Sequence, residues 1–397
     1  DLLVSYLQLP QVGALGRIGL TARRFTHVVR VRPRYCTLKK MTSAERLERI
    51  FLGEMVDVVP FALKGWRIPP CPEERQLLED GMAILDAAPV YRTHSPHVSV
   101  ETHNVQQDGI NLQRRVIKTP VGVLSSIHRP LDTARVERTT WLIDPPFKSP
   151  SDYAILEFMA RDRRHEPCYD VFESAVADMG GKAFFKTGAP GCALHTILYS
   201  YMGPERFAIE WSERRDRVLS LCAQMEANER AIYEIVAHSP ASIVQCGGNY
   251  APEMMGLPRF SEHVLPHWES AGAILHEGGK QIGCHLDANN AIWASQVGAS
   301  SLDWIEAFTP APDTDMTMAE ARAAWPDKTL FINFPSSVHL QPAAEIAATT
   351  RKLLRDAAPG SRFVVGITEN VPEHRWRESF RVILDTLNAE GQLPLRG

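Results

Sequence analysis

The chain of 397 residues lacks several patterns that define large classes of protein. No apolar run reaches the roughly 18 residues needed to cross a bilayer, so we expect no transmembrane helix. A formal net charge of −4 gives no general attraction to nucleic acid. There is also no P-loop, GxSxG, HExxH or GxGxxG motif. The usual signatures of phosphate binding, serine hydrolysis, zinc-peptidase chemistry and dinucleotide binding are therefore missing.

The cysteines form no CxxC pair. There are seven of them, and an odd, scattered set in a long chain predicts free thiols in a reducing compartment, which we take to be the cytoplasm. Most are expected to be small apolar fillers. Cys246 ends a predicted strand and could instead act as a thiolate ligand, although we favour the filler role.

The composition that is present is ordinary for a globular protein, with 44% hydrophobic and 23% charged residues. Residues 1–40 differ, because they carry eight Lys or Arg and one acid. One interpretation is a targeting segment. The other, which we favour, is that the folded unit, and the natural start, begin at Met41. We thus predict a basic extension over 1–40 and a single domain over 41–397.

Short apolar, β-rich runs alternate with helical segments along most of the chain. Strands and helices at this spacing predict parallel strands joined by right-handed crossovers. The sequence therefore predicts the α/β class and a TIM (β/α)8 barrel, of which seven strands can be located and the eighth cannot. The seven runs are 56–63, 182–187, 241–246, 281–286, 303–308, 329–334 and 362–368.

The alternation of predicted strands and helices is interrupted between about residues 69 and 150. A helix is predicted over 73–88. Alternating Thr- and Val-rich runs then predict a β-rich, antiparallel insertion folded over one end of the barrel. Nothing in this segment specifies chemistry. The four predicted strands are 98–102, 112–118, 122–128 and 135–142.

Polar residues follow the predicted strands at their carboxyl ends, where barrels of this type hold their active sites. His285 and Asp287 are two residues apart at one strand end, so they face the same side. Glu306 and Glu369 end two later strands. Such a cluster suits acid–base catalysis, for which we select Glu306. It also suits a site in which His285, Asp287 and Glu369 hold a metal or polarise the substrate.

Five further residues are candidates for substrate binding. Lys64 and Arg67 follow the first strand and could hold a substrate carboxylate, although a solvated loop is an equal alternative. Asn249 and Asn333 are amides at strand exits, suited to orienting a substrate. His339 lies beyond the sixth strand, where a site role and a surface role are equally well supported.

Four segments of the chain resemble the uroporphyrinogen decarboxylase superfamily. They are MTSAERLERIFLGEMVDVVPF at 41–61, TPVGVLSS at 119–126, DPPFKSPSDYAILEF at 144–158 and RFSEHVLPHWESAGAILHEGGKQIGCHLDAN at 259–289. The resemblance runs from Met41 to about residue 387. It implies a (β/α)8 barrel and one of two chemistries. One is the metal-free decarboxylation of uroporphyrinogen. The other is methyl transfer to or from a corrinoid or a thiol, with zinc held by His and Cys.

Departures from the family pattern bear on both chemistries. The resemblance places the His-x-Cys zinc motif of the methyltransferase branch on His285-Leu286-Asp287, so a carboxylate replaces the thiolate. Carboxylate favours a metal harder than zinc, or no metal. The Arg-rich opening of the decarboxylases corresponds to 61–67, which has only the two cations Lys64 and Arg67. The methyltransferase branch is therefore the closer match.

We accordingly expect a methyltransferase- or demethylase-like enzyme acting on a small methylated substrate, with a divalent metal and a corrinoid carried by a partner protein. The alternative is a decarboxylase of uroporphyrinogen or another carboxylate, which would need no cofactor. A third hypothesis is a non-catalytic barrel that binds a corrinoid protein or a small ligand.

Overall fold

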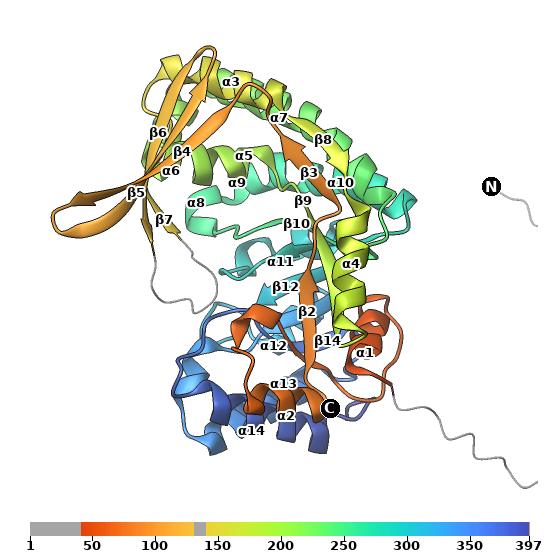
Figure 1. The fold of residues 1–397 in the computed structure, drawn as a ribbon. Coiled ribbons are helices and arrows are strands. Elements are labelled where there is room, and N and C mark those ends of the chain that lie inside the picture. Colours follow the sequence, from red (N-terminus) through yellow and green to blue (C-terminus); the bar gives the residue numbers. More distant parts are fainter. Residues whose placement is uncertain (1–40, 131–139, 397) are drawn as a thin grey trace, which may run out of the picture. The chain divides into compact units, whose positions relative to one another are not determined.

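A closed barrel of eight parallel strands forms the centre of the protein (Figure 1). The structure is a computed structural model that describes residues 41–130 and 140–396. The predicted TIM barrel is confirmed, whereas the predicted basic extension over 1–40 lies outside the described residues. In order around the barrel the strands are β1 (Phe61–Leu63), β14 (Phe363–Ile367), β13 (Thr329–Asn333), β12 (Trp304–Phe308), β11 (Gln281–His285), β10 (Ile243–Gly248), β9 (Ala183–Ala189) and β2 (Ala83–Ala87).

Strand β2 is the barrel strand that the sequence pattern missed. The helix predicted over 73–88 is wrong in its second half, because α2 ends at Glu79 and β2 follows. β2 pairs in parallel with both β1 and β9, and its first three residues are buried. A short apolar run of this kind fits a buried strand or a buried helix equally well by periodicity, so the neighbouring strands decide. The barrel thus takes one strand from the range assigned to the insertion.

Helices cover the outside of the barrel (Figure 1). A capping box begins the first helix, since the Thr42 side chain accepts from the Glu45 backbone amide at 3.2 Å and the Glu45 carboxylate accepts from the Thr42 backbone amide at 2.7 Å. The helices are α1 (Ser43–Phe51), α2 (Pro72–Glu79), α3 (Tyr153–Asp162), α4 (Tyr169–Met179), α5 (Ala193–Thr196), α6 (Gly203–Glu213), α7 (Arg215–Ala237), α8 (Pro252–Met255), α9 (Leu257–Arg259), α10 (Leu265–Glu277), α11 (Ala294–Ala299), α12 (Met318–Ala324), α13 (Ala343–Asp356) and α14 (Trp376–Glu390).

Aromatic rings fill the amino-terminal half of the barrel. Phe51 from α1 packs edge-on against Trp304, with ring centroids 5.3 Å apart, and Phe331 lies beside them. Glycine makes room for these rings, because a Cβ at Gly283 would lie 2.1 Å from the Trp304 ring and one at Gly366 would lie 2.1 Å from Phe331. The amino-terminal half of the barrel is therefore a packed core and not an open pore.

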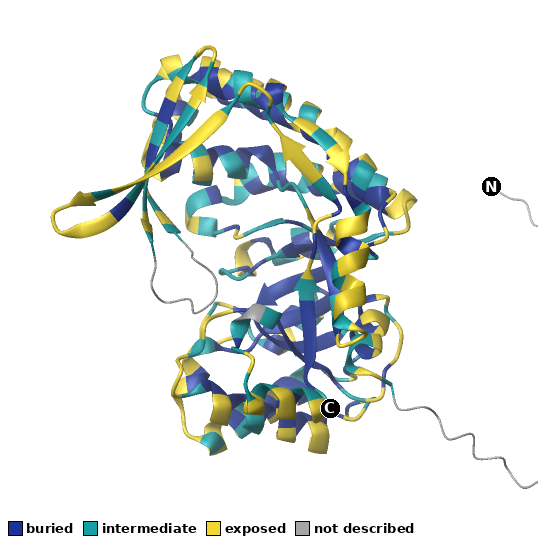
Figure 2. Cartoon of the chain, in the orientation of Figure 1, coloured by how far each residue is buried: buried dark blue, intermediate teal, exposed yellow. Residues whose placement is uncertain are grey.

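The predicted β-rich insertion is an antiparallel four-stranded sheet, in the order β4 (Ser99–Gln107), β5 (Ile110–Thr119), β6 (Gly122–Pro130) and β7 (Thr140–Asp144). It packs against α3, and Leu124 joins Ile155 in the main core. A second, two-stranded sheet pairs β3 (Tyr91–His94) with β8 (Arg164–Pro167). Burial is concentrated in the barrel strands, whereas much of the inserted sheet is exposed (Figure 2). None of the helices in the described segments is long and apolar enough to cross a membrane.

Candidate active site

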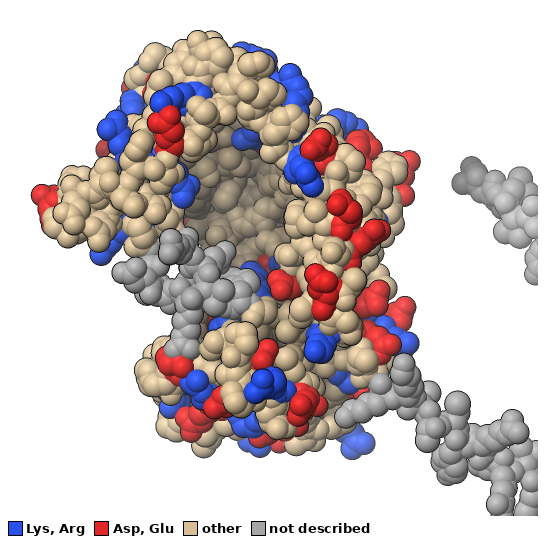
Figure 3. Space-filling model, viewed as in Figure 1, with Lys and Arg blue, Asp and Glu red and all other residues tan. Residues whose placement is uncertain are grey.

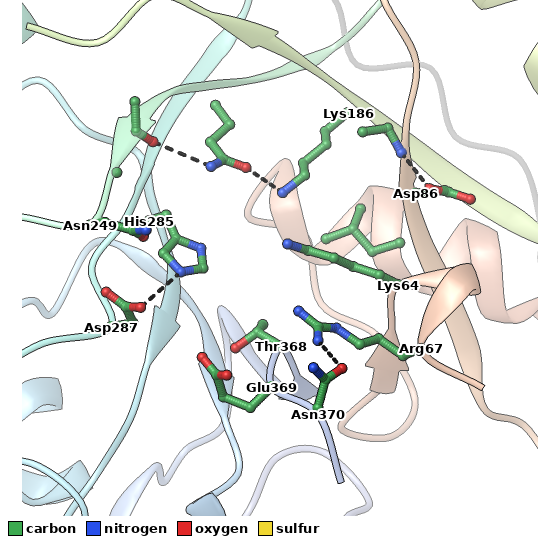
Figure 4. A pocket seen from close by; sticks show the side chains of 15 residues that line it. Lys64, Arg67, Asp86, Lys186, Asn249, His285, Asp287, Thr368, Glu369 and Asn370 are labelled. Carbon is green, nitrogen blue, oxygen red and sulfur yellow. Dashed lines mark hydrogen bonds and ion pairs between the residues drawn. The ribbon is translucent and has the colours of Figure 1, made fainter. Parts of the chain in front are cut away.

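A polar cavity of about 650 Å³ lies at the carboxyl ends of the barrel strands (Figure 4). Strands β9, β10 and β12 each place a polar side chain two residues after an apolar one that packs in the amino-terminal half of the barrel, and His285 of β11 follows Gly283 at the same spacing. Since alternate residues of a strand face the same side, a polar layer lies directly on the aromatic floor. Six of the nine predicted site residues are among its lining residues, which are Lys64, Arg67, Leu85, Asp86, Ala87, Lys186, Gln245, Gly247, Gly248, Asn249, His285, Asp287, Thr368, Glu369 and Asn370.

Glu306 lies beneath this cavity and is fully buried. Its Oε1 accepts a hydrogen bond from the Lys186 ammonium and lies 3.8 Å from Lys64 Nζ, while its Oε2 is 2.9 Å from His285 Nδ1. Burial by itself raises the pKa of Glu306. The charge of Lys186, with help from His285 and Lys64, outweighs burial and holds that pKa well below its usual range. Glu306 is therefore an ionised carboxylate inside the barrel.

His285 lies between two carboxylates. Strand register sets Glu306 opposite His285 across β11 and β12, and Asp287 Oδ2 lies 3.4 Å from the other ring nitrogen, Nε2. Each ring nitrogen therefore faces a carboxylate oxygen, an arrangement that favours the protonated, imidazolium form of the ring. Burial lowers the pKa of His285, but the hydrogen bonds to Asp287 and Glu306 outweigh burial and raise it overall.

The backbone around His285 is closely fitted. Gly248 of β10 lies opposite His285, and a Cβ there would come within 2.5 Å of the His285 Cβ. The Asn249 amide donates to the His285 carbonyl at 2.9 Å, from a left-handed backbone with φ of 59°. Ala307 also has a left-handed backbone, at φ of 64°, where the register of β12 shifts just after Glu306. A non-glycine residue in the left-handed conformation costs about 1–2 kcal/mol, and backbone strain of this kind clusters at functional sites.

Lys186 is the main site residue that the sequence analysis missed. Its ammonium donates to Gln245 Oε1 and to Glu306, and it is almost completely buried. Burial lowers the pKa of Lys186, and the Glu306 charge opposes this only in part. A signal was available, because Lys186 is a cation within the apolar run KAFFKT and shares its inward face with Phe184.

Asn333 and His339 were predicted to bind substrate, but neither lines the cavity. The Asn333 side chain is buried and accepts from the Thr368 amide at 2.9 Å, so it positions the end of β14. His339 is buried against Phe334 and bonds Ser379 Oγ at 2.6 Å. Burial lowers the pKa of His339 to about 4, as expected for a neutral ring within the core.

The three predicted metal ligands do not converge on one point. His285 faces a carboxylate at each ring nitrogen, and Glu369 is exposed at the rim. No three His, Cys, Asp or Glu side chains converge as metal ligands anywhere in residues 41–130 or 140–396. Cys246 lies outside the cavity lining, and burial raises the pKa of its thiol, so it stays a neutral filler.

Comparison with solved structures supports the barrel fold. A methyltransferase from Methanosarcina mazei superimposes with a TM-score of 0.52 at 11% sequence identity, over 88% of this chain and 99% of that protein. The fold is one that a methyltransferase also has. A nitroalkane oxidase from Streptomyces ansochromogenes matches over 50% of this chain and 53% of that protein, with a TM-score of 0.25 and 12% identity. No model of a protein family matches the chain, and neither does any curated protein.

Proposed function

We propose that this protein is a methyltransferase- or demethylase-like enzyme that uses His285 to protonate the leaving group of a small methylated substrate. The observation that carries the proposal is the position of the His285 ring between the carboxylates of Glu306 and Asp287 at the cavity floor, which favours its protonated form. A cavity of about 650 Å³ is large enough for a small molecule. The barrel shared with a methyltransferase of 11% identity is consistent with the same class of reaction.

The two nitrogens of His285 have different roles in this proposal. Nδ1 faces buried Glu306, and the carboxylate of Glu306 holds the Nδ1 proton in place and orients the ring. Nε2 lies beside Asp287, which lines the cavity, so its proton can pass to a substrate atom that binds there. In a substrate R–X–CH3, the bond between carbon and the heteroatom X breaks and the electron pair stays on X. X then takes the Nε2 proton and leaves as R–XH.

The methyl group needs a nucleophile from outside this cavity. No cysteine is among the residues that line it, the buried Lys186 amine donates to Glu306, and Lys64 is assigned to an anionic group of the substrate. We therefore propose that the acceptor is a corrinoid or a thiol brought by a partner protein or a cosubstrate. The polar rim suits the substrate, since Lys64 and Arg67 can hold an anionic group while Asn249 and Glu369 can bind its donors and acceptors.

Decarboxylation is a second candidate, because two cations lie on the rim of the same cavity as the acid. Lys64 and Arg67 can bind substrate carboxylates. The bond between carbon and the carboxylate would then break, CO2 would leave, and the Nε2 proton of His285 would go to the carbon. Both reactions use the same proton donor. The two differ in whether CO2 or a methyl group leaves the substrate.

The test is to incubate the purified protein with O-, N- and S-methylated small acids, using chemically reduced cobalamin as methyl acceptor, and to follow methylcobalamin by absorbance. We expect turnover that His285→Gln lowers by about 10²–10⁴-fold. Uroporphyrinogen is assayed in parallel for release of CO2. CO2 release without methyl transfer would replace the first proposal by the second. Equal methyl transfer by wild type and His285→Gln would contradict the role of the imidazolium.

A further inference from the structure

A second cavity, of about 870 Å³, adjoins the polar one. The two share Asn249 and Asp287 as lining residues, so they meet beside His285. The inserted sheet contributes to the wall of the second cavity through β7, and the chain around α6 and α8 contributes other parts of that wall. Its lining residues are Thr140, Trp141, Leu142, Ile143, Asp144, Pro145, Tyr199, Met202, Gly203, Pro204, Glu205, Arg206, Asn249, Ala251, Met254, Asp287 and Ala288.

The second cavity is much more apolar than the first. Trp141 and Ile143 face it from β7 with 67% and 50% of their surfaces exposed, and Met202 and Met254 lie on its walls. Large apolar side chains left exposed within a concave surface indicate a ligand site. The space-filling view shows a deep hollow on this face of the molecule, with few charged side chains on its wall (Figure 3).

The first cavity has the opposite character. Lys64 and Arg67 lie on its rim, and Asp86, Lys186 and Gln245 also line it. These cationic and polar groups suit the polar end of a ligand.

We propose that the substrate is an elongated amphiphile. Its acidic or hydroxylated end binds Lys64 and Arg67, and its apolar body lies in the second cavity against Trp141 and Ile143. Its reacting atom then sits where the cavities meet, beside Asp287 and the Nε2 proton of His285. This inference rests on the proposed function and adds the substrate class. It also gives the insertion a role, because β7 selects the apolar end.

The binding test uses straight-chain carboxylates of increasing length: butyrate, hexanoate and octanoate. Each is titrated calorimetrically into the wild-type protein. We expect one saturable site per chain, with the affinity rising about threefold to fourfold for each added methylene that is buried. The carboxylate end is common to all three compounds. The slope of affinity against length therefore reports only the apolar cavity.

Three variants separate the two ends. Trp141→Ser should flatten the slope while leaving butyrate affinity within about twofold, because butyrate is too short to use the cavity fully. Lys64→Met should lower the affinity for all three compounds by a similar factor and leave the slope of affinity against length unchanged. Val123→Ser is the matched control, since Val123 is an apolar residue of the same sheet, 58% exposed, that does not line the cavity. It should behave as wild type. Trp141 and Val123 are both exposed, so neither change threatens folding.

Several outcomes would overturn this inference. One is a wild-type slope near zero, and another is a slope that Trp141→Ser leaves intact. An equal loss of the slope in Val123→Ser would place the compounds on the surface of the sheet instead of in the cavity. Non-saturable binding would show that the compounds bind without a specific site. His285→Gln should keep the slope, since it removes the acid and not the apolar wall. Loss of turnover with an intact slope would therefore contradict only the proposed reaction.

Discussion

Replacing Lys186 by Met should strongly destabilise the protein, because the change leaves a charge buried without its main partner. Glu306 is fully buried and the Lys186 side chain is 5% exposed. Removing one member of a buried ion pair typically costs about 3–5 kcal/mol. Lys64 and His285 remain near the Glu306 carboxylate, at 3.8 and 2.9 Å, and still stabilise part of its charge. We therefore expect the lower end of that range, about 3 kcal/mol. Met fills nearly the same volume, so a cavity adds little.

The chain offers a matched control in the same segment. Lys182 precedes β9 and is exposed, so Lys182→Met should change the unfolding free energy by no more than about 0.5 kcal/mol. The double variant Lys186→Met with Glu306→Gln removes both charges of the pair. It should recover at least about 2 kcal/mol relative to Lys186→Met, because no uncompensated carboxylate remains.

Urea unfolding at pH 7 measures these differences, followed by tryptophan fluorescence and far-UV circular dichroism together. Coincident transitions are required, since a barrel of this size can unfold through intermediates. The midpoint should fall in Lys186→Met while the slope with urea stays unchanged. If Lys186→Met and Lys182→Met are equally stable, or if the double variant is the least stable of the set, the buried pair does not exist as described.

The remaining predictions concern the acid and the glycines around it. The pKa of His285 is raised, so turnover that needs its imidazolium should be constant below that pKa and fall about tenfold per pH unit above it, in pH–rate profiles of wild type. The folded pKa of Glu306 is depressed. The stability that ionised Glu306 contributes is therefore complete above the unfolded pKa of about 4.3 and is lost as the pH falls below that value towards the folded pKa. In acid-unfolding titrations, Glu306→Gln should abolish this part of the loss. Gly248→Ala would place a Cβ 2.5 Å from His285, so turnover should fall more than about tenfold while circular dichroism shows a folded protein. Gly283→Ala would press on Trp304 in the floor and should cost about 1–3 kcal/mol in urea unfolding.

Local patterns in the sequence determined much of the barrel. Seven strands were evident because each is a short apolar run bounded by turn residues, and the capping box at Thr42 marked the start of α1. The period of two in a strand put His285 and Asp287 on one side, and the structure has both lining the cavity. Thr- and Val-rich alternation also indicated the antiparallel insertion.

Parts of the site could not be predicted in this way. Asn333 ends a strand as Asn249 does, yet it bonds Thr368 below the rim while Asn249 lines the cavity. The strand ends placed His285, Asp287 and Glu369 at one end of the barrel, but their spacing did not indicate that His285 also pairs with the buried Glu306. Residue type and spacing state which groups are available. They do not state which of those groups bond one another.

Periodicity, capping and turn residues are local features, so they were enough to predict the parallel barrel, the inserted sheet and the end of the barrel that carries the candidate site. Long-range packing established that β2 closes the barrel, that Lys186 neutralises Glu306, and that β7 forms part of the wall of a second cavity. Each of these depends on residues far apart in the chain, 120 positions for Lys186 and Glu306. Such contacts are set by how the strands pack around the closed sheet, and no local pattern encodes them.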